Sequence, residues 1–205
     1  MKKTILALAT MLCAATASAQ ILDFEGMPPY KLGITAALNV PYFSRSGYDC
    51  TIGLQAGADL MVDASDLIKN TYGRTQVLYT MKGSTLSTSY GDYYYTTHYI
   101  EIPIHYGYAW MIDADWTITA ETGPYLAVGL GGTERPESKI GRSSRTFFNG
   151  CNASRFDYGW GLQAGLLFEQ QLMLNVGYEL GFKNMNSTFL QNRNFYIGLT
   201  YFIDY

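Results

Sequence analysis

The side chains of this 205-residue chain that could do chemistry are charged or imidazole groups set singly into segments of alternating apolar residues. They are Lys31, Asp59, Lys82, Glu101, His105, Glu121, Asp157, Glu179 and Lys183. Carboxylates near His105 could form an acid–base site, because both groups can transfer protons. The same residues also suit a polar network inside a narrow barrel, where charges removed from water must be paired. We favour the network, and expect no catalytic residue and no enzyme activity.

Other patterns of reactive residues are missing from the sequence. Neither His98 nor His105 has a metal-ligand spacing to a neighbour, and no Gly-x-Ser-x-Gly segment or Cys–His set is present. We therefore expect no metal site and no cofactor. The formal net charge of −3 gives no indication of a nucleic-acid partner.

Residues 99–110, which contain Glu101 and His105, show how the chain is built. In their sequence, YIEIPIHYGYAW, every second residue is large and apolar, and the residues between are charged, polar or small. Strand side chains alternate between two faces, so this segment predicts a strand with one apolar and one polar face. Pro103 predicts a bulge or a missing ladder bond, because proline has no backbone donor.

The same alternation recurs along the chain and predicts eight strands. They cover approximately residues 31–40, 51–62, 74–82, 99–110, 116–130, 156–168, 172–183 and 194–205. Connections 111–115 and 169–171 are short, whereas loops 83–97 and 131–155 are long. Short turns at one end and long loops at the other are typical of outer-membrane barrels. We predict an all-β fold, an eight-stranded antiparallel up-and-down transmembrane β-barrel.

Two features indicate that the apolar face contacts lipid. The polar positions are rich in glycine, which suits a crowded and curved interior better than a solvated surface. Aromatic residues gather at the strand ends, with Trp110, Trp116 and Phe168 near short turns and Phe156 and Tyr158 near a long loop. Such rings form girdles at membrane interfaces. We therefore expect outer-membrane lipid as a partner, and a monomeric barrel.

The N-terminal residues predict export. Lys2 and Lys3 precede an apolar run, and Ala17-Ser18-Ala19 provides a cleavage site, which is typical of a secretory signal peptide. We predict a signal peptide at residues 1–19 and one outer-membrane barrel domain at residues 20–205.

Cys50 and Cys151 remain in the mature chain, and both fall on the predicted outer side of the barrel. An exported protein permits a disulfide, which here would fold the 131–155 loop over the barrel mouth. Two free thiols are the alternative.

Several blocks of sequence, in order, resemble a known family. Residues 99–104 (YIEIPI) resemble the Leu-Glu-Ile-Pro signature of the Bacteroidota-type outer-membrane β-barrel domain that includes PorT-like proteins. Residues 121–125 (ETGPY), 156–159 (FDYG) and 178–181 (YELG) resemble its later blocks. The resemblance implies an integral barrel in the bacterial outer membrane. It does not imply the role of PorT in protein secretion.

The last predicted strand carries a second resemblance. Tyr196, Gly198, Tyr201 and Ile203 resemble the signal by which barrel-assembly machinery recognises its clients, which implies that machinery as a partner. An ordinary alternating strand is the alternative interpretation.

The expected function is a non-enzymatic structural or interaction role through extracellular loops, with an extracellular partner that the sequence does not name. A narrow, porin-like conduit for small molecules or ions and a secretion-accessory barrel remain alternatives. A membrane-embedded enzyme is the least favoured, because the sequence shows no nucleophile–base pair.

Overall fold

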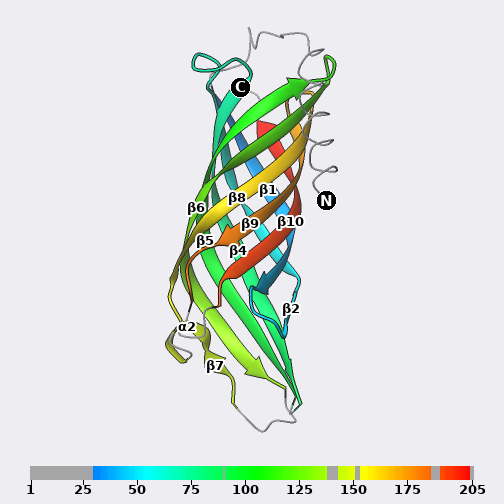
Figure 1. Ribbon diagram of the computed structural model, residues 1–205. Helices are drawn as coiled ribbons and strands as arrows, with labels where there is room; N and C mark the ends of the chain where they lie inside the picture. The colour runs from blue at the N-terminus through cyan, green and yellow to red at the C-terminus, as the bar shows by residue number, and fades with distance from the viewer. Residues whose placement is uncertain (1–29, 90, 138–142, 151–152, 186–189, 204–205) are drawn as a thin grey trace, which may run out of the picture.

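The computed structural model describes residues 30–89, 91–137, 143–150, 153–185 and 190–203. Its long strands form one closed antiparallel barrel (Figure 1). They are β1 (Tyr30–Phe43), β3 (Gly53–Asp63), β4 (Thr71–Thr88), β5 (Gly91–Met111), β6 (Trp116–Pro136), β8 (Phe156–Phe168), β9 (Leu172–Gly181) and β10 (Asn192–Ile203). Each pairs with the next long strand along the chain, and β10 pairs with β1 to close the ring. The predicted eight-stranded barrel is confirmed.

Three short elements lie together at one end of the barrel, at the bottom of Figure 1. They are β2 (Tyr48–Asp49), β7 (Arg145–Thr146) and the four-residue helix α2 (Phe147–Gly150). In the part of the chain that the structure describes, no helix is long and apolar enough to cross a membrane.

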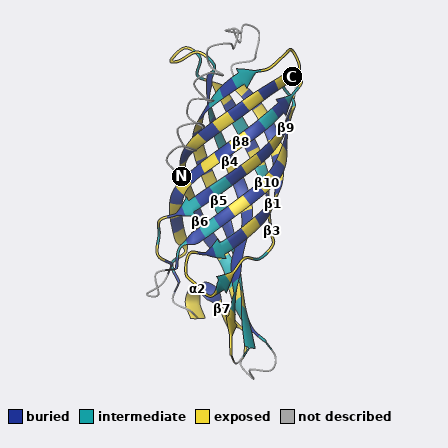
Figure 2. Ribbon diagram, turned by 45° about the vertical axis from the view of Figure 1, so that its right-hand side comes forward, coloured by how far each residue is buried: buried dark blue, intermediate teal, exposed yellow. Residues whose placement is uncertain are grey.

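Exposed and buried residues alternate along the strands, as the banding in Figure 2 shows. In β1 the alternation runs almost without interruption from Tyr30 to Phe43. The exposed set is apolar, and includes Leu162, which is 56% exposed in the middle of β8. The polar set points inward. A continuous exposed apolar belt around a closed barrel is the surface expected in contact with lipid.

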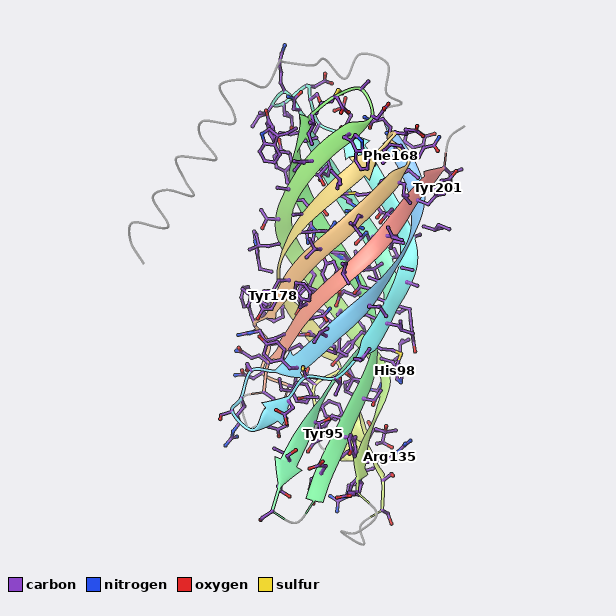
Figure 3. All side chains as sticks on the ribbon, turned by 90° about the vertical axis from the view of Figure 1, so that its right-hand side faces the viewer. Tyr95, His98, Arg135, Phe168, Tyr178 and Tyr201 are labelled. Carbon is purple, nitrogen blue, oxygen red and sulfur yellow. The ribbon has the colours of Figure 1, made fainter. Side chains whose placement is uncertain are left out.

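Aromatic rings gather on the outer face near the two ends of this belt. At the end with the short turns, the ring centroids of Trp116 and Phe168 lie 4.6 Å apart. Figure 3 shows Phe168 and Tyr201 at that end, and Tyr178 nearer the other. The hydroxyl of Tyr178 lies 2.8 Å from that of Tyr42. These positions match the interfacial girdles that the sequence predicts.

Strands β4, β5 and β6 continue well past the rim of the barrel. They have 18, 21 and 21 residues, whereas about 9–11 residues cross a bilayer as a strand. β3 pairs with β4 only as far as Thr80, and β8 pairs with β6 only as far as Val128. Beyond these points, residues 83–88, 91–98 and 129–136 form an extension that we call the outer sheet.

The outer sheet corrects the prediction of a loop at residues 83–97 and, for residues 131–136 only, the prediction of a loop at residues 131–155. A strand that has left the lipid needs no apolar face, so the polar composition of these residues was interpreted as a loop. Threonine and tyrosine nevertheless favour strands. β2 pairs with β4 and β7 pairs with β6 at the two sides of this sheet. We call the end of the barrel that carries it the outer end, and the opposite end the inner end.

The ladder is irregular at Pro103. Between β4 and β5 the register passes from the Thr75–Ile104 pair directly to the Leu78–Glu101 pair. Pro103 therefore lacks a ladder partner on β4, and the Thr75 hydroxyl donates to its carbonyl at 3.0 Å instead. A register shift between β5 and β6 lies farther along, at His98 and Tyr99.

Candidate functional site

The middle of the barrel is filled by a guanidinium between two carboxylates. Arg74 donates from Nε and Nη2 to Asp59, at 3.0 and 2.6 Å, and from Nη1 to Glu121 at 2.8 Å. All three side chains are at most 1% exposed. A bidentate arginine–carboxylate pair gives buried charges the geometry they need to compensate each other. We call these three residues the Arg74 group.

Neutral side chains add further hydrogen bonds to this group. Thr200 accepts from Arg74 at 3.0 Å and from Asn175 at 2.9 Å. Gln163 donates to Glu121 and accepts from the Tyr196 hydroxyl at 2.6 Å. These hydrogen bonds connect the Arg74 group to strands β8, β9 and β10.

His105 lies beside the Arg74 group, but the geometry does not make an acid–base site. Its Nδ1 lies 3.6 Å from Glu121 Oε1, an oxygen that already accepts from Arg74. The imidazole also leaves little space at its other side, because a Cβ added at Gly161 would lie 2.7 Å from Nε2. The imidazole therefore packs closely against the backbone of β8 at Gly161, and a packing role explains its position.

A second buried group lies nearer the outer end. Lys82 donates from Nζ to Glu101 and, at 3.0 Å, to Glu179. Asn194 adds a donor to Glu179 at 3.1 Å, and Nζ lies 4.6 Å from the centre of the Tyr125 ring. This is a cation–π distance, so the ring supports the charge of the ammonium. We call Lys82, Glu101 and Glu179 the Lys82 group.

Asp157 lies close to the Lys82 group and is also held by neutral donors. Its carboxylate accepts from Asn192 Nδ2 at 2.7 Å and from the Tyr125 hydroxyl at 3.3 Å. Asp157 therefore links β8 to its neighbour β6 and, through the barrel interior, to β10.

Lys31 and Lys183 lie away from both groups. Lys31 is at the inner end, where it donates to the backbone and side-chain oxygens of Gln170 at 3.0 and 3.1 Å. Lys183 follows the last residue of β9, Gly181, and is half-buried. The inward position of Lys183 stays a prediction, because the strand itself ends two residues earlier.

Arg74 is the central residue that the sequence analysis missed. Arg74 and Lys82 lie an even number of positions apart on β4, and Lys82 was predicted to point inward. Side chains an even number of positions apart on a strand share one face, so the alternation alone places Arg74 inside the barrel. Leu78 obscured the signal because it is apolar, yet it too faces inward and is buried.

An aromatic cluster closes the outer end above the Lys82 group. It contains Phe43, Tyr99 and Tyr125 from the barrel wall and Phe147 and Phe148 from α2, all nearly inaccessible to water. The Phe43 and Phe147 rings stack with centroids 6.2 Å apart. We call these five residues the aromatic plug.

A glycine makes room for the plug. A Cβ at Gly129 would lie 2.2 Å from Phe148 Cζ, so any larger residue there would displace the ring. At the inner end, by contrast, a cavity of about 30 Å³ remains beside Lys31 and Tyr72. That volume admits water and nothing larger.

The predicted disulfide is not formed in the structure. Cys50 is exposed and free, and Cys151 lies outside the described residues. Residues 143–150 are instead held to the barrel through Phe147 and Phe148. Among the described side chains, no group of three or more histidine, cysteine or acidic residues could hold a metal ion.

The residues that resemble an assembly signal divide between the two faces of β10. Tyr201 and Ile203 face outward and are exposed. Tyr196 points inward and is buried, and Gly198 packs closely against Ala37. Recognition by assembly machinery stays a prediction.

Comparisons with known proteins agree with the barrel. The family model described as outer membrane protein beta-barrel domain matches residues 18–187. Among solved structures, the surface protein A (NspA) of Neisseria is 14% identical, with 85% of this chain and 97% of that one covered and a TM-score of 0.48. Ail, the attachment invasion locus protein of Yersinia pestis, is 12% identical, with 86% and 100% covered and a TM-score of 0.40. No curated protein matches the chain.

Proposed function

Because the chain belongs to the outer membrane protein beta-barrel domain family, and so lies in the bacterial outer membrane, we propose that it is a non-enzymatic surface protein. Its outer sheet contacts a partner outside the cell, and its barrel anchors that sheet in lipid. The observation that carries the proposal is the contrast between an interior filled by buried ion pairs and a sheet that exposes Tyr94, Thr133 and Arg135.

The outer sheet has the properties of a recognition surface. Tyr94 is 45% exposed, and Thr133 and Arg135 are exposed on the neighbouring strand. Figure 3 shows Tyr95 and Arg135 on this extension, beyond the barrel. Aromatic and arginine side chains are enriched at protein interfaces, and a paired sheet holds them at low entropic cost. Strand pairing with β2 and β7 fixes the sheet, so it is a preformed surface.

A conduit is the alternative in the same membrane, and two observations argue against it. The Arg74 and Lys82 groups fill the barrel at successive levels, and the aromatic plug closes its outer end. An eight-stranded barrel has an interior only wide enough for its side chains. An ion would have to displace buried ion pairs to cross it.

Several finer features belong to the same proposal. Residues 1–19 are a signal peptide, the barrel-assembly machinery inserts the mature chain through its last strand, and the barrel is a monomer. The chain is related to the PorT-like proteins, a relationship that the resemblance of its YIEIPI segment to their signature supports. Its Glu101 lies in the Lys82 group, so we assign that signature a structural role rather than one in secretion.

Site-specific photo-cross-linking on intact cells tests the proposed surface. A photo-reactive phenylalanine analogue at position 94 is expected to give a discrete adduct with an extracellular partner. The matched control is the same analogue at position 201, which faces outward at the inner end and should give lipid adducts only. Identical adduct patterns at the two positions would contradict the proposal.

A further inference from the structure

Opposite the outer sheet, the rim formed by β9, β10 and β1 carries a cation on the lipid-facing side. The outward residues of β10 include Phe195, Ile197 and Leu199. Arg193 precedes Phe195 by two residues, so it belongs to the same face, at the outer end of that strand. A charge at this position lies where the apolar belt gives way to the headgroup region.

The guanidinium of Arg193 is held by neutral acceptors. It donates to the backbone oxygens of Gly181 and Asn192, at 2.6 and 3.2 Å, and to Gln191 Oε1 at 3.1 Å. None of the ion pairs within the described residues includes Arg193. The backbone contacts orient the group without neutralising it, which leaves a fixed positive charge toward the membrane surface.

Two tyrosine hydroxyls lie beside this charge. Tyr42 is the register partner of Arg193 on β1, and Tyr178 is the partner of Phe195 on β9. Their hydroxyl oxygens are 2.8 Å apart, so one hydroxyl donates to the other. The accepting hydroxyl keeps its own proton for an external acceptor. The rim therefore offers a guanidinium and a hydroxyl donor side by side.

An apolar groove begins on the same strands, nearer the middle of the belt. It has a volume of about 530 Å³ and is lined by Leu38, Leu54, Leu174, Ile197 and Leu199. Ala36 and Ala56 lie in the groove wall, and their small side chains help to make it hollow. Ile197 is four residues from Arg193, or about 13 Å along a strand. That separation suits one amphiphile with its headgroup at the rim and a chain in the groove.

We propose that Arg193, with the Tyr42–Tyr178 pair, binds the phosphate of an outer-leaflet lipid whose acyl chain lies in this groove. Arginine pairs with phosphate through parallel N–H donors, and the pair is stronger where lipid excludes water. The groove favours a lipid over free inorganic phosphate, because inorganic phosphate has no acyl chain that could fill the groove. The site does not include the outer sheet, so it stands apart from the proposed recognition of an extracellular partner.

Lipid binding by the purified full-length barrel in neutral detergent tests this site. The probes are phosphatidic acid and diacylglycerol with matching chains, so that they differ only in the phosphate. We expect the wild type to bind phosphatidic acid at least about tenfold more tightly, as charge-assisted hydrogen bonds predict. Inorganic phosphate at the same concentration should not displace it.

Variants show which residues produce the preference for phosphatidic acid. Arg193→Gln should remove the preference for phosphatidic acid, whereas the matched change Arg135→Gln on the outer sheet should preserve it. The double variant Tyr42→Phe with Tyr178→Phe keeps the charge of Arg193 and should reduce the preference for phosphatidic acid in part. It still tests the site if Arg193→Gln does not fold. Ala36→Phe should weaken both lipids by similar factors, because it fills the groove.

Three results would overturn the inference: equal affinity of the wild type for the two lipids, an unchanged preference in both the Arg193→Gln and the double variant, or displacement by inorganic phosphate. The last would mean a site for free phosphate. Heat-modifiable gel migration checks that each variant is folded.

Discussion

The same three strands, β4, β5 and β6, build two regions with opposite chemistry. Inside the barrel their charged residues, such as Arg74 and Glu121, are buried and paired. Beyond the rim, in the outer sheet, residues such as Tyr94 and Arg135 are exposed. Charge in this molecule is therefore paired where the barrel encloses it and available for recognition where the strands leave the barrel. Substitutions in the two regions should therefore have separable effects.

The largest expected effect is at Arg74. Arg74→Leu leaves Asp59 and Glu121 buried without their cation, and breaking a buried pair in this way costs about 3–5 kcal/mol. Urea unfolding in lipid vesicles, followed by tryptophan fluorescence, measures the loss. The same change at the exposed Arg135 should leave the unfolding free energy nearly unchanged. Equal losses at the two arginines would remove the contrast between the regions.

The next effect concerns the lipid-facing belt. Leu162→Arg should destabilise the barrel by about 2–4 kcal/mol, because a charge would enter the hydrocarbon near mid-membrane. Thr133→Arg is the matched change on the outer sheet, where the new side chain meets water. Vesicle unfolding of both variants gives the comparison. If Leu162→Arg were as stable as Thr133→Arg, the apolar face would not contact lipid.

A smaller effect is expected from close packing inside the barrel. A Cβ at Gly107 would lie 2.4 Å from Tyr72 Cζ, so Gly107→Ala must displace that ring. Such overpacking costs about 1–3 kcal/mol. Tyr72→Leu should relieve the clash, so a double-mutant cycle should show a favourable coupling between the two changes. Simple additivity of the two losses would show that the ring does not cover the glycine.

The smallest effect on stability is expected in the outer sheet. Tyr94→Ala should change the unfolding free energy by no more than about 0.5 kcal/mol, because the side chain is exposed. The photo-cross-link formed by an analogue at Arg135 should nevertheless weaken in this variant, since both residues belong to the proposed surface. A stability loss as large as that of Arg74→Leu would mean that Tyr94 supports the barrel instead.

The sequence predicted most of the barrel because its main signal, the two-residue alternation, is local. Ile102 and Leu162 reveal their faces through their immediate neighbours, and eight such segments predict a closed ring. The outer sheet was missed because a strand outside the lipid needs no apolar face. Its sequence then lacks the alternation of apolar and polar residues that revealed the other strands. The structure has Cys50 free rather than in the expected disulfide, and cysteine spacing alone says nothing of how a loop folds.

The interior network was predictable as a set but not as pairs. Lys82, Glu101 and Glu179 were all expected to point inward, yet their contact depends on the stagger of strands far apart in the chain. Arg74 was overlooked although its parity with Lys82 placed it inside. The position of Phe147 and Phe148 in the mouth of the barrel depends on tertiary packing, for which the local sequence holds no periodic signal.

Electrical recording in planar bilayers shows whether the barrel is a sealed anchor whose function lies on the outer sheet. The folded wild-type protein, inserted at a density checked by heat-modifiable migration, should give no unitary current steps. Reproducible steps of one size across independent insertions would contradict a sealed barrel, because ions would then pass the Arg74 group, the Lys82 group and the aromatic plug.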